Sequence, residues 1–114
     1  IIGIYGNRHP SFQQSLTQQL NDIKRLSDSG IPVCICGDFN CSFSDSYYFT
    51  KQSRETLLRT FSDYDIELLT KNEAKCIDHI AVSKRFISNS GIQIAEWNQD
   101  KLLSDHKGIA VCFS

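Results

Sequence analysis

The 114-residue sequence predicts one small domain of mixed helix and strand, an α/β or α+β arrangement. Three observations favour this class: short apolar runs typical of strands, two segments with the period of amphipathic helices, and Gly or Pro at the boundaries between them. The composition, 40% hydrophobic and 22% charged, is that of a globular protein. The most hydrophobic stretch, residues 31–39, is far short of the roughly 20 residues that cross a bilayer, so we expect no membrane span.

The first part of the chain has the pattern strand, helix, strand. Residues 1–5 form an apolar run closed by a turn, which predicts a short strand. Ser11 begins a helix, with Gln14 three residues later as a capping box and apolar residues at spacings of three and four. Gly30 ends this helix. Residues 33–37 are too few and too apolar for a surface helix and predict a buried strand.

The rest of the chain adds one helix and several strands. Residues 41–53 are rich in Ser, Asp and aromatic residues, which is typical of a long loop. A second helix is expected near residues 54–61. Further strands are expected at residues 66–69, 77–83, 92–97 and 108–113.

The sequence contains five cysteines, an odd number that argues against a complete disulfide framework. It favours a reducing compartment, and we expect a cytoplasmic protein. The cysteine spacing does not match the four ligands of a structural zinc site. Cys34 and Cys36 alternate along a predicted strand and share one of its faces, where we interpret them as small buried hydrophobic residues.

The net charge of −1 gives no basic field of the kind expected of a protein that holds nucleic acid through phosphate contacts alone. An enzyme that meets phosphate through a bound divalent cation needs less of such a field. The N-terminus shows no secretory signal pattern. The chain begins with Ile1 and contains no methionine, which predicts a fragment. Because the last predicted strand runs almost to residue 114, we expect the missing part upstream.

Three motifs place ionisable groups next to predicted strands. Gly-Asp-Phe-Asn at residues 37–40 closes the buried strand, Ile-Asp-His-Ile at residues 77–80 opens another, and Ser-Asp-His-Lys-Gly at residues 104–108 precedes the last. Strand ends are where loops gather and where α/β folds place their sites. Each motif alone is also compatible with a turn or a cap. Their occurrence together, in this order and ending a few residues before the C-terminus, is specific.

In this combination the chain resembles the endonuclease/exonuclease/phosphatase superfamily over nearly all its length. The superfamily includes abasic-site endonucleases, pancreatic-type deoxyribonucleases, retroelement endonucleases, inositol-polyphosphate phosphatases and bacterial sphingomyelinases. The resemblance implies that residues 1–114 are the C-terminal part of a single domain with the DNase I-like fold, half of a four-layer α/β/β/α sandwich without its N-terminal half. One sheet face would then be uncovered, so we expect the fragment to self-associate.

The resemblance implies a catalytic role for four residues. The family carries, at the position of Asp38, a carboxylate that orients or deprotonates the attacking water, and an ionised carboxylate suits this because it only accepts hydrogen bonds. Asn40 would contact the phosphate, and His106 would stabilise the charge that develops on its oxygens. Asp78 would pair with His106, raise its pKa and fix its tautomer.

Further positions are expected at the metal and at the substrate. The family uses a divalent cation, Mg²⁺ or Mn²⁺, and Asp105 is expected beside it, directly or through water. The family's main ligands, an Asn and a Glu, would lie upstream, so Asp105 with Asp38 can only complete the site. Three residues of the first loop are expected at the substrate phosphate: Tyr5, Asn7 and Arg8.

His79 alternates to the opposite face of its strand from Asp78, so we expect it to pack or to support the site from behind. The aromatic-rich residues 43–49 would stack on bases or a lipid, or pack. The sequence therefore predicts a metal-dependent phosphoester hydrolase, in the first place a nuclease, present as an inactive fragment. The alternatives are a phosphomonoesterase or lipid phosphodiesterase of the same superfamily, and a non-catalytic interaction module that retains the sheet.

Overall fold

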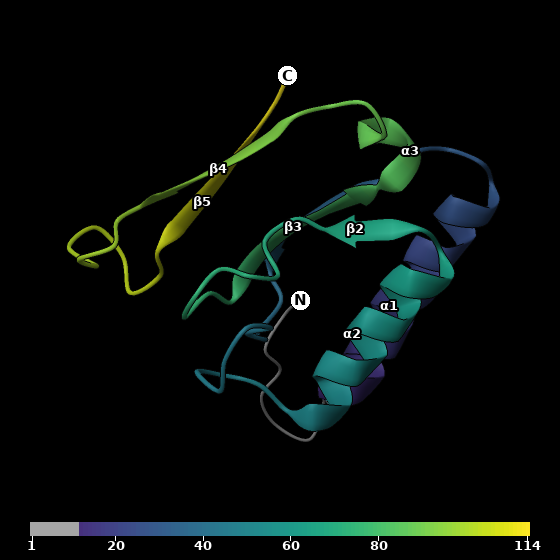
Figure 1. The fold of residues 1–114 in the computed structure, drawn as a ribbon. Coiled ribbons are helices and arrows are strands. Elements are labelled where there is room, and N and C mark those ends of the chain that lie inside the picture. Colours follow the sequence, from purple (N-terminus) through teal and green to yellow (C-terminus); the bar gives the residue numbers. More distant parts are fainter. Residues whose placement is uncertain (1–11) are drawn as a thin grey trace.

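The computed structural model describes residues 12–114 and shows two long helices, one short helix and five strands in this part of the chain (Figure 1). The elements in order are α1 (Phe12–Asp28), β1 (Cys34–Asp38), α2 (Lys51–Asp63), β2 (Ile66–Leu68), β3 (Asp78–Ser83), α3 (Lys84–Ile87), β4 (Ile92–Trp97) and β5 (Gly108–Phe113). The strand expected at residues 1–5 lies outside the described residues, as do the three expected phosphate contacts, Tyr5, Asn7 and Arg8.

The two long helices are amphipathic, and each has a local signal at one end. After α1 the chain turns at Gly30, whose φ of +85° is readily adopted only by glycine. α2 begins after Thr50, whose Oγ1 accepts a hydrogen bond from the backbone N–H of Ser53 at 3.1 Å. This cap explains why α2 starts three residues before its predicted position. No helix among residues 12–114 combines the length and the apolar character required to span a bilayer.

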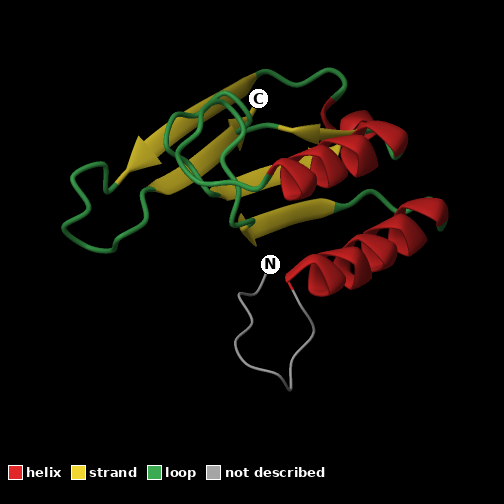
Figure 2. Cartoon of the chain, turned by 90° about the horizontal axis from the view of Figure 1, so that it is seen from below, coloured by secondary structure: helices red, strands yellow, loops and turns green. Residues whose placement is uncertain are grey.

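The strands form two antiparallel sheets. β3 is the centre of a three-stranded sheet of order β1-β3-β2, and β4 pairs with β5 in a separate hairpin. Figures 1 and 2 show α1 and α2 on one side of the three-stranded sheet and the hairpin on its other side. The expected mixed class of helix and strand is therefore confirmed in this coarse form, as an α+β arrangement of antiparallel sheets.

The core fills the space between the two long helices and the three-stranded sheet. Phe39, directly after β1, packs against Phe61 of α2 with 6.2 Å between the ring centroids. Burial of each large apolar side chain in such a cluster contributes about 1.5–3 kcal/mol to the free energy of unfolding. The buried members are Leu16, Leu20, Phe39, Cys41, Leu57, Phe61, Ile66, Leu68 and Ala81.

The opposite face of the sheet is only partly covered. Cys34 pairs with Val82 across the two strands, so both side chains point to this face. Val82 on β3 is 1% exposed, whereas Cys34 and Cys36 on β1 are exposed. The expected burial of these two cysteines is therefore wrong, because the cover over β3 does not extend to β1. All five cysteines are free thiols, and two, Cys41 and Cys76, are buried.

Candidate functional site

The site begins where β1 ends and β3 starts. Asp38, the last residue of β1, pairs with Asp78, the first residue of β3. Directly opposed residues of an antiparallel pair point to the same face, so both carboxylates project away from the helices. Gly37 precedes Asp38 with a φ of +141°, a conformation that side-chain-bearing residues rarely adopt. A side chain at this position would therefore strain the backbone next to Asp38.

The Gly-Asp-Phe-Asn segment is fixed by its own turn. The backbone N–H of Asn40 donates to Oδ1 of Asp38 at 2.8 Å, and Asn40 has a φ of +51°. Asn tolerates this left-handed conformation, and an Asp that accepts from the residue two positions later forms a local turn. Phe39, between them, is buried in the core. The apolar residue thus anchors the turn while its two polar neighbours lie at the sheet end.

The third motif reaches the same place from the β4–β5 loop. Nδ1 of His106 lies 2.6 Å from Oδ2 of Asp78. Asn98, directly after β4, holds the loop closed: its Nδ2 donates to the carbonyl oxygens of Ser104 and His106, and its Oδ1 accepts from the N–H of Leu103 at 2.9 Å. Oγ of Ser104 accepts from the N–H of His106 at 3.1 Å. The histidine is therefore positioned by its loop before any substrate binds.

The charges around His106 favour its protonated form. The hydrogen bond from Nδ1 to Asp78 raises the pKa of His106, and the negative charges of Asp78, Asp38 and Asp105 act in the same direction, while partial burial opposes them. Nε2 faces the opposite way from the Asp78 bond and lies 3.8 Å from Oδ1 of Asp105. The imidazolium therefore presents one N–H to the outside of the pair, where an anionic oxygen can bind.

His79, next to Asp78 in sequence, faces the core. It is 1% exposed, and its Nδ1 lies 2.7 Å from Oγ1 of Thr70. Its Nε2 lies 2.7 Å from the carbonyl oxygen of Cys41 and 2.9 Å from that of Cys76. Carbonyl oxygens only accept hydrogen bonds, so Nε2 carries the hydrogen. Burial lowers the pKa of His79, which keeps it neutral.

The bonds of His79 tie the segment after β1 to the segment before β3. Phe43 of the aromatic-rich loop packs edge-on against the imidazole, with 4.8 Å between the ring centroids. His79 therefore has the packing role expected of it, and Phe43 packs as well. His79 affects the site indirectly, because its hydrogen bonds join the segment that carries Asp38 to the segment that carries Asp78.

Two cavities adjoin the Asp78–His106 pair. One of about 130 Å³ is lined by Ile77, Asp78, Asp105 and His106 together with two tyrosines and three lysines: Tyr47, Tyr48, Lys75, Lys101 and Lys107. A more open one of about 480 Å³ lies along β4 and β5, between the same pair and Trp97. Sequence reasoning did not single out the tyrosines or lysines of the smaller cavity; the concentration of aromatic residues at 43–49 was the one available signal.

Within residues 12–114, Asp38, Asp78 and His106 form the one group of three or more candidate ligands whose atoms, one per residue, all lie within 4.8 Å of one another. Carboxylate oxygens suit Mg²⁺ and Mn²⁺, which need about six ligands, whereas the imidazole is already bonded to Asp78. The described residues thus fit part of a coordination sphere. Asp105 lies outside this group, and its side chain is 93% exposed.

A sequence model described as the Endonuclease/Exonuclease/phosphatase family matches residues 2–106. The matched range contains the first two motifs and the Ser-Asp-His of the third, and it ends at His106, so it covers each side chain that the structure gathers at the sheet end. Searches of curated proteins and of solved structures found no match. Since the family model covers most of its 114 residues, the chain belongs to the endonuclease/exonuclease/phosphatase family, whose members act on phosphoester bonds with divalent metal ions.

Proposed function

We propose that the chain is part of a metal-dependent nuclease and supplies its water-activating and phosphate-binding residues. The observation that carries the proposal is the meeting of Asp38, Asp78 and His106 at one sheet end, from segments up to 68 positions apart (106 − 38). A structural ion pair such as Asp78 with His106 needs no second carboxylate beside it. A hydrolytic site needs one group for water and another for the phosphate.

Each residue has a role that its chemistry permits. Asp38 holds the attacking water and accepts its proton, and the carboxamide of Asn40 donates to a phosphoryl oxygen. Nε2–H of His106 stabilises the negative charge that develops on the phosphate. Asp78 is a positioning residue, because it acts through Nδ1 of His106. We assign Tyr5, Asn7 and Arg8 to further contacts with the substrate phosphate.

We propose Mg²⁺ or Mn²⁺ as the cation, held in part by Asp38 and, directly or through water, by Asp105. When bound, such an ion polarises the phosphoryl oxygens and neutralises their charge. The described residues alone do not provide six oxygens, so further ligands have to come from elsewhere. This supports the inference that residues 1–114 are the C-terminal part of one larger domain, a four-layer sandwich.

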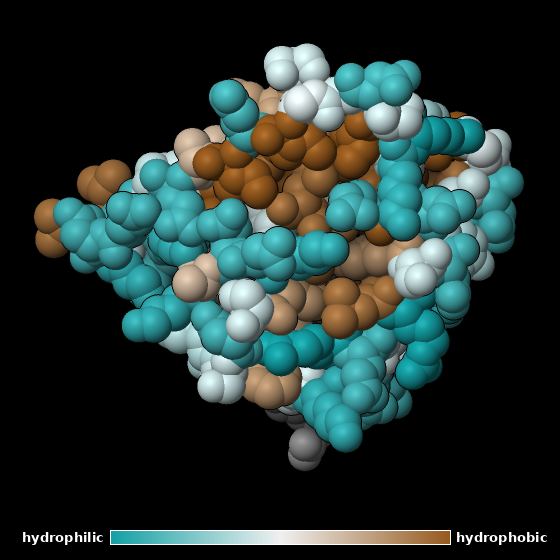
Figure 3. Space-filling model, in the orientation of Figure 1, coloured by the Kyte–Doolittle hydropathy of each residue, from teal (hydrophilic) through white to brown (hydrophobic). Residues whose placement is uncertain are grey.

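The apolar surface between the β4–β5 hairpin and the three-stranded sheet also supports the inference of a larger domain. Figure 3 shows an apolar hollow between the hairpin and the three-stranded sheet, which a globular protein buries. Phe86 and Phe113 are 6.0 Å apart by ring centroid, and both are exposed. We therefore expect the 114-residue chain on its own to self-associate. With five free thiols, a reducing compartment is favoured, and we propose the cytoplasm.

One observation favours a second candidate, a phosphodiesterase that acts at a lipid surface. Leu102 and Leu103 at the tip of the β4–β5 loop are 83% and 81% exposed. Figure 3 shows apolar atoms at the end of the molecule where this loop lies in Figure 1. Exposed apolar pairs of this kind mark contact sites.

The test uses the longest open reading frame that contains these residues, referred to below as the complete protein. With Mg²⁺ or Mn²⁺ it should cleave plasmid or abasic DNA, lose this activity with EDTA and lose it in His106→Ala. Absence of metal-dependent cleavage of DNA would reject the nuclease, and hydrolysis of phospholipid vesicles in its place would support the second candidate.

The 114-residue chain should be inactive in the same assay, because residues 12–114 fit only part of the cation site. Light scattering should show an assembly larger than a monomer. A monodisperse monomer with metal-dependent cleavage that disappears in His106→Ala would contradict the partial-domain proposal.

A further inference from the structure

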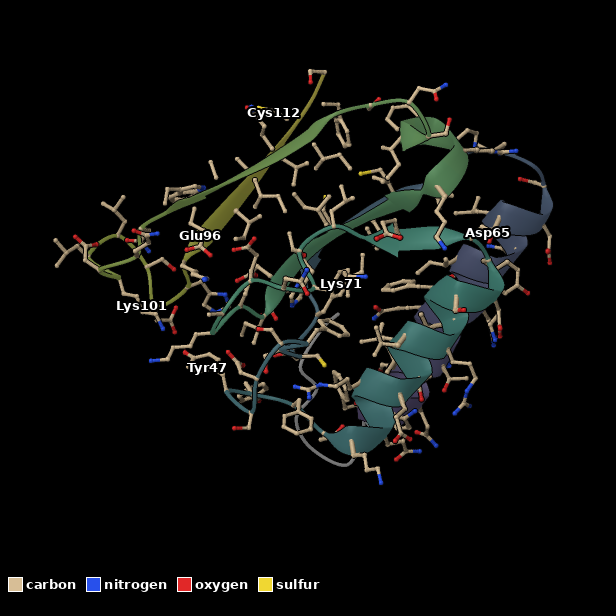
Figure 4. The ribbon with its side chains drawn as sticks, viewed as in Figure 1. Tyr47, Asp65, Lys71, Glu96, Lys101 and Cys112 are labelled. Atoms are coloured by element: carbon tan, nitrogen blue, oxygen red, sulfur yellow. The ribbon has the colours of Figure 1, made fainter. Side chains whose placement is uncertain are left out.

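The smaller cavity beside the Asp78–His106 pair is walled by two loops that touch each other. Tyr47 lies in the loop between β1 and α2, and Lys101 lies in the β4–β5 loop, 54 positions away. Nζ of Lys101 donates to the phenol oxygen of Tyr47 at 2.9 Å and lies 5.2 Å from the centre of its ring. Figure 4 shows these two labelled side chains next to each other on the side of the molecule that carries the β4–β5 loop.

Both sides of this contact are held by bonds of their own. Oδ1 of Asp45 accepts from the N–H of Tyr47 at 3.1 Å, and its Oδ2 accepts from the N–H of Lys75 at 2.8 Å. These two bonds lower the pKa of Asp45, so they persist at neutral pH. The N–H of Lys101 donates to the carbonyl oxygen of Asn98 at 3.0 Å. The wall is therefore largely formed before a ligand arrives, which reduces the entropy lost on binding.

Lys101 lines the cavity, and the group that its ammonium binds, the phenol of Tyr47, is not an anion. Lys107 also lines the cavity, but its Nζ binds Oε1 of Glu96 at 2.7 Å and the carbonyl oxygen of Ala74. Hydrogen bonds from Glu73 and Lys107 lower the pKa of Glu96 to about 2, so Glu96 neutralises Lys107 throughout the neutral range. The phenol of Tyr47 is neutral and cancels no charge on Lys101.

Two aromatic faces accompany this cation. Tyr47 and Tyr48 line the cavity and are 45% and 55% exposed, although large aromatic side chains of a folded domain usually pack. Aromatic rings next to a cation that forms no ion pair within residues 12–114 suit a ligand that carries both a planar ring and a phosphate. A polyphosphorylated inositol offers no planar face, and a quaternary ammonium headgroup would meet the like charge of Lys101.

We infer that Tyr47, Tyr48 and Lys101 form a subsite for the nucleoside that adjoins the scissile phosphate, with a base on the tyrosine rings and the neighbouring phosphate at Lys101. This inference rests on the proposed phosphodiesterase function and assigns its substrate class as a polynucleotide. The subsite consists of specificity-determining residues, since none of the three is part of the Asp38, Asp78 and His106 group.

The test compares two esters that share a leaving group and differ by the nucleoside: thymidine 5′-(p-nitrophenyl phosphate) and methyl p-nitrophenyl phosphate. For the complete protein with Mg²⁺ or Mn²⁺, the ratio of kcat/KM for the nucleoside ester to that for the methyl ester should fall about tenfold in Tyr47→Leu and in Lys101→Gln. Lys71→Gln is the matched control, because it removes an equal charge from a residue that pairs with Glu67 and does not line the cavity. It should leave the ratio unchanged.

Tyr47→Phe separates stacking from anchoring, since it keeps the ring and removes only the oxygen that binds Lys101. A smaller fall than in Tyr47→Leu is expected, and this variant keeps the test decisive if Tyr47→Leu does not fold. An unchanged ratio in both Tyr47→Phe and Lys101→Gln would overturn the subsite while leaving the hydrolase intact. An equal loss with both esters would also overturn it, because the residues would then serve phosphate binding in general.

If neither ester is hydrolysed, the proposed function fails, and the subsite is judged by binding alone. A fluorescently labelled oligothymidylate should bind the complete protein, and Lys101→Gln should raise its Kd about tenfold by fluorescence anisotropy, whereas Lys71→Gln should not. Equal Kd values for the two variants would overturn the subsite independently of catalysis.

Discussion

Asp78 and His79 are consecutive residues of β3, yet they meet opposite sides of the same sheet. His79 points to the helices, where three hydrogen bonds fix its ring, and burial lowers its pKa against the opposing effect of the two carbonyl bonds. Asp78 points to the open side, where it bonds His106 and raises the pKa of that histidine. The environment of each histidine, and not the residue type, therefore decides which one is structural and which one is available for chemistry.

The largest expected effect tests the open side. Asp38→Asn keeps the oxygen that accepts from the N–H of Asn40 but removes the negative charge, so the turn should persist while water is no longer polarised. We expect kcat of the complete protein to fall by about 10²–10⁴-fold. Asp63→Asn, at the end of α2 on the helix side, is the control and should retain activity. An active Asp38→Asn enzyme would remove Asp38 from the mechanism.

The next effect tests the helix side. His79→Leu leaves the buried hydroxyl of Thr70 and two carbonyl oxygens without their partner, so the free energy of unfolding should fall by about 2–4 kcal/mol. Urea unfolding followed by far-UV circular dichroism measures this change. A loss below about 0.5 kcal/mol, the usual size for surface substitutions, would show that His79 does not support the sheet end.

A third effect concerns the hairpin that carries His106. Gly108 pairs with Trp97, and a Cβ at Gly108 would overlap the indole ring. Gly108→Ala should therefore displace the ring and destabilise the protein by about 1–3 kcal/mol, the usual cost of overpacking. Because the chain has one tryptophan, its fluorescence reports this movement directly in the 114-residue chain. An emission spectrum identical to that of the unmodified chain would show that the ring does not depend on this glycine.

The smallest expected effect is that the pKa values of the two histidines of β3 and the β4–β5 loop, His79 and His106, shift in opposite directions. By NMR, the midpoint of His106 should lie above the usual value of about 6.5 and that of His79 below it. In Asp78→Asn the midpoint of His106 should fall, because the carboxylate that favours the charged ring is gone.

The sign of the stability effect follows from the raised pKa of His106. Its pairing with Asp78 stabilises the fold fully below the pKa of an unfolded histidine, about 6.5, and this contribution is lost as pH rises through the higher folded value. The difference in unfolding free energy between the unmodified protein and Asp78→Asn should therefore shrink as pH rises. A constant difference would contradict the assigned pairing.

The sequence predicts most elements because their signals are local. The strands at Cys34–Asp38, Ile92–Trp97 and Gly108–Phe113 lie within one residue of their expected positions, since apolar alternation and Gly or Pro breaks define them. The helix α3 was not predicted, because its four residues are too few to show a helical period. The burial of Cys34 and Cys36 was predicted wrongly, because it depends on what covers the sheet, which local patterns do not contain.

The sequence likewise predicts one part of the candidate site and not the other. Convergence of the three motifs follows from their position at strand ends and from the family resemblance. The contact between Tyr47 and Lys101 has no local signal, because it joins two loops whose approach depends on how the hairpin packs against the sheet. The three lysines of the smaller cavity were missed for this reason, as only the tertiary fold gathers them.

The side chain of Asn98 closes the β4–β5 loop at its base, by bonds to the backbone of Leu103, Ser104 and His106. Residues 99–102 accept none of these side-chain bonds, so we expect that they can be replaced without displacing the imidazole. Substitutions at residues 99–102 should therefore change the side chains that the loop presents, while the bond between Asp78 and His106 is kept.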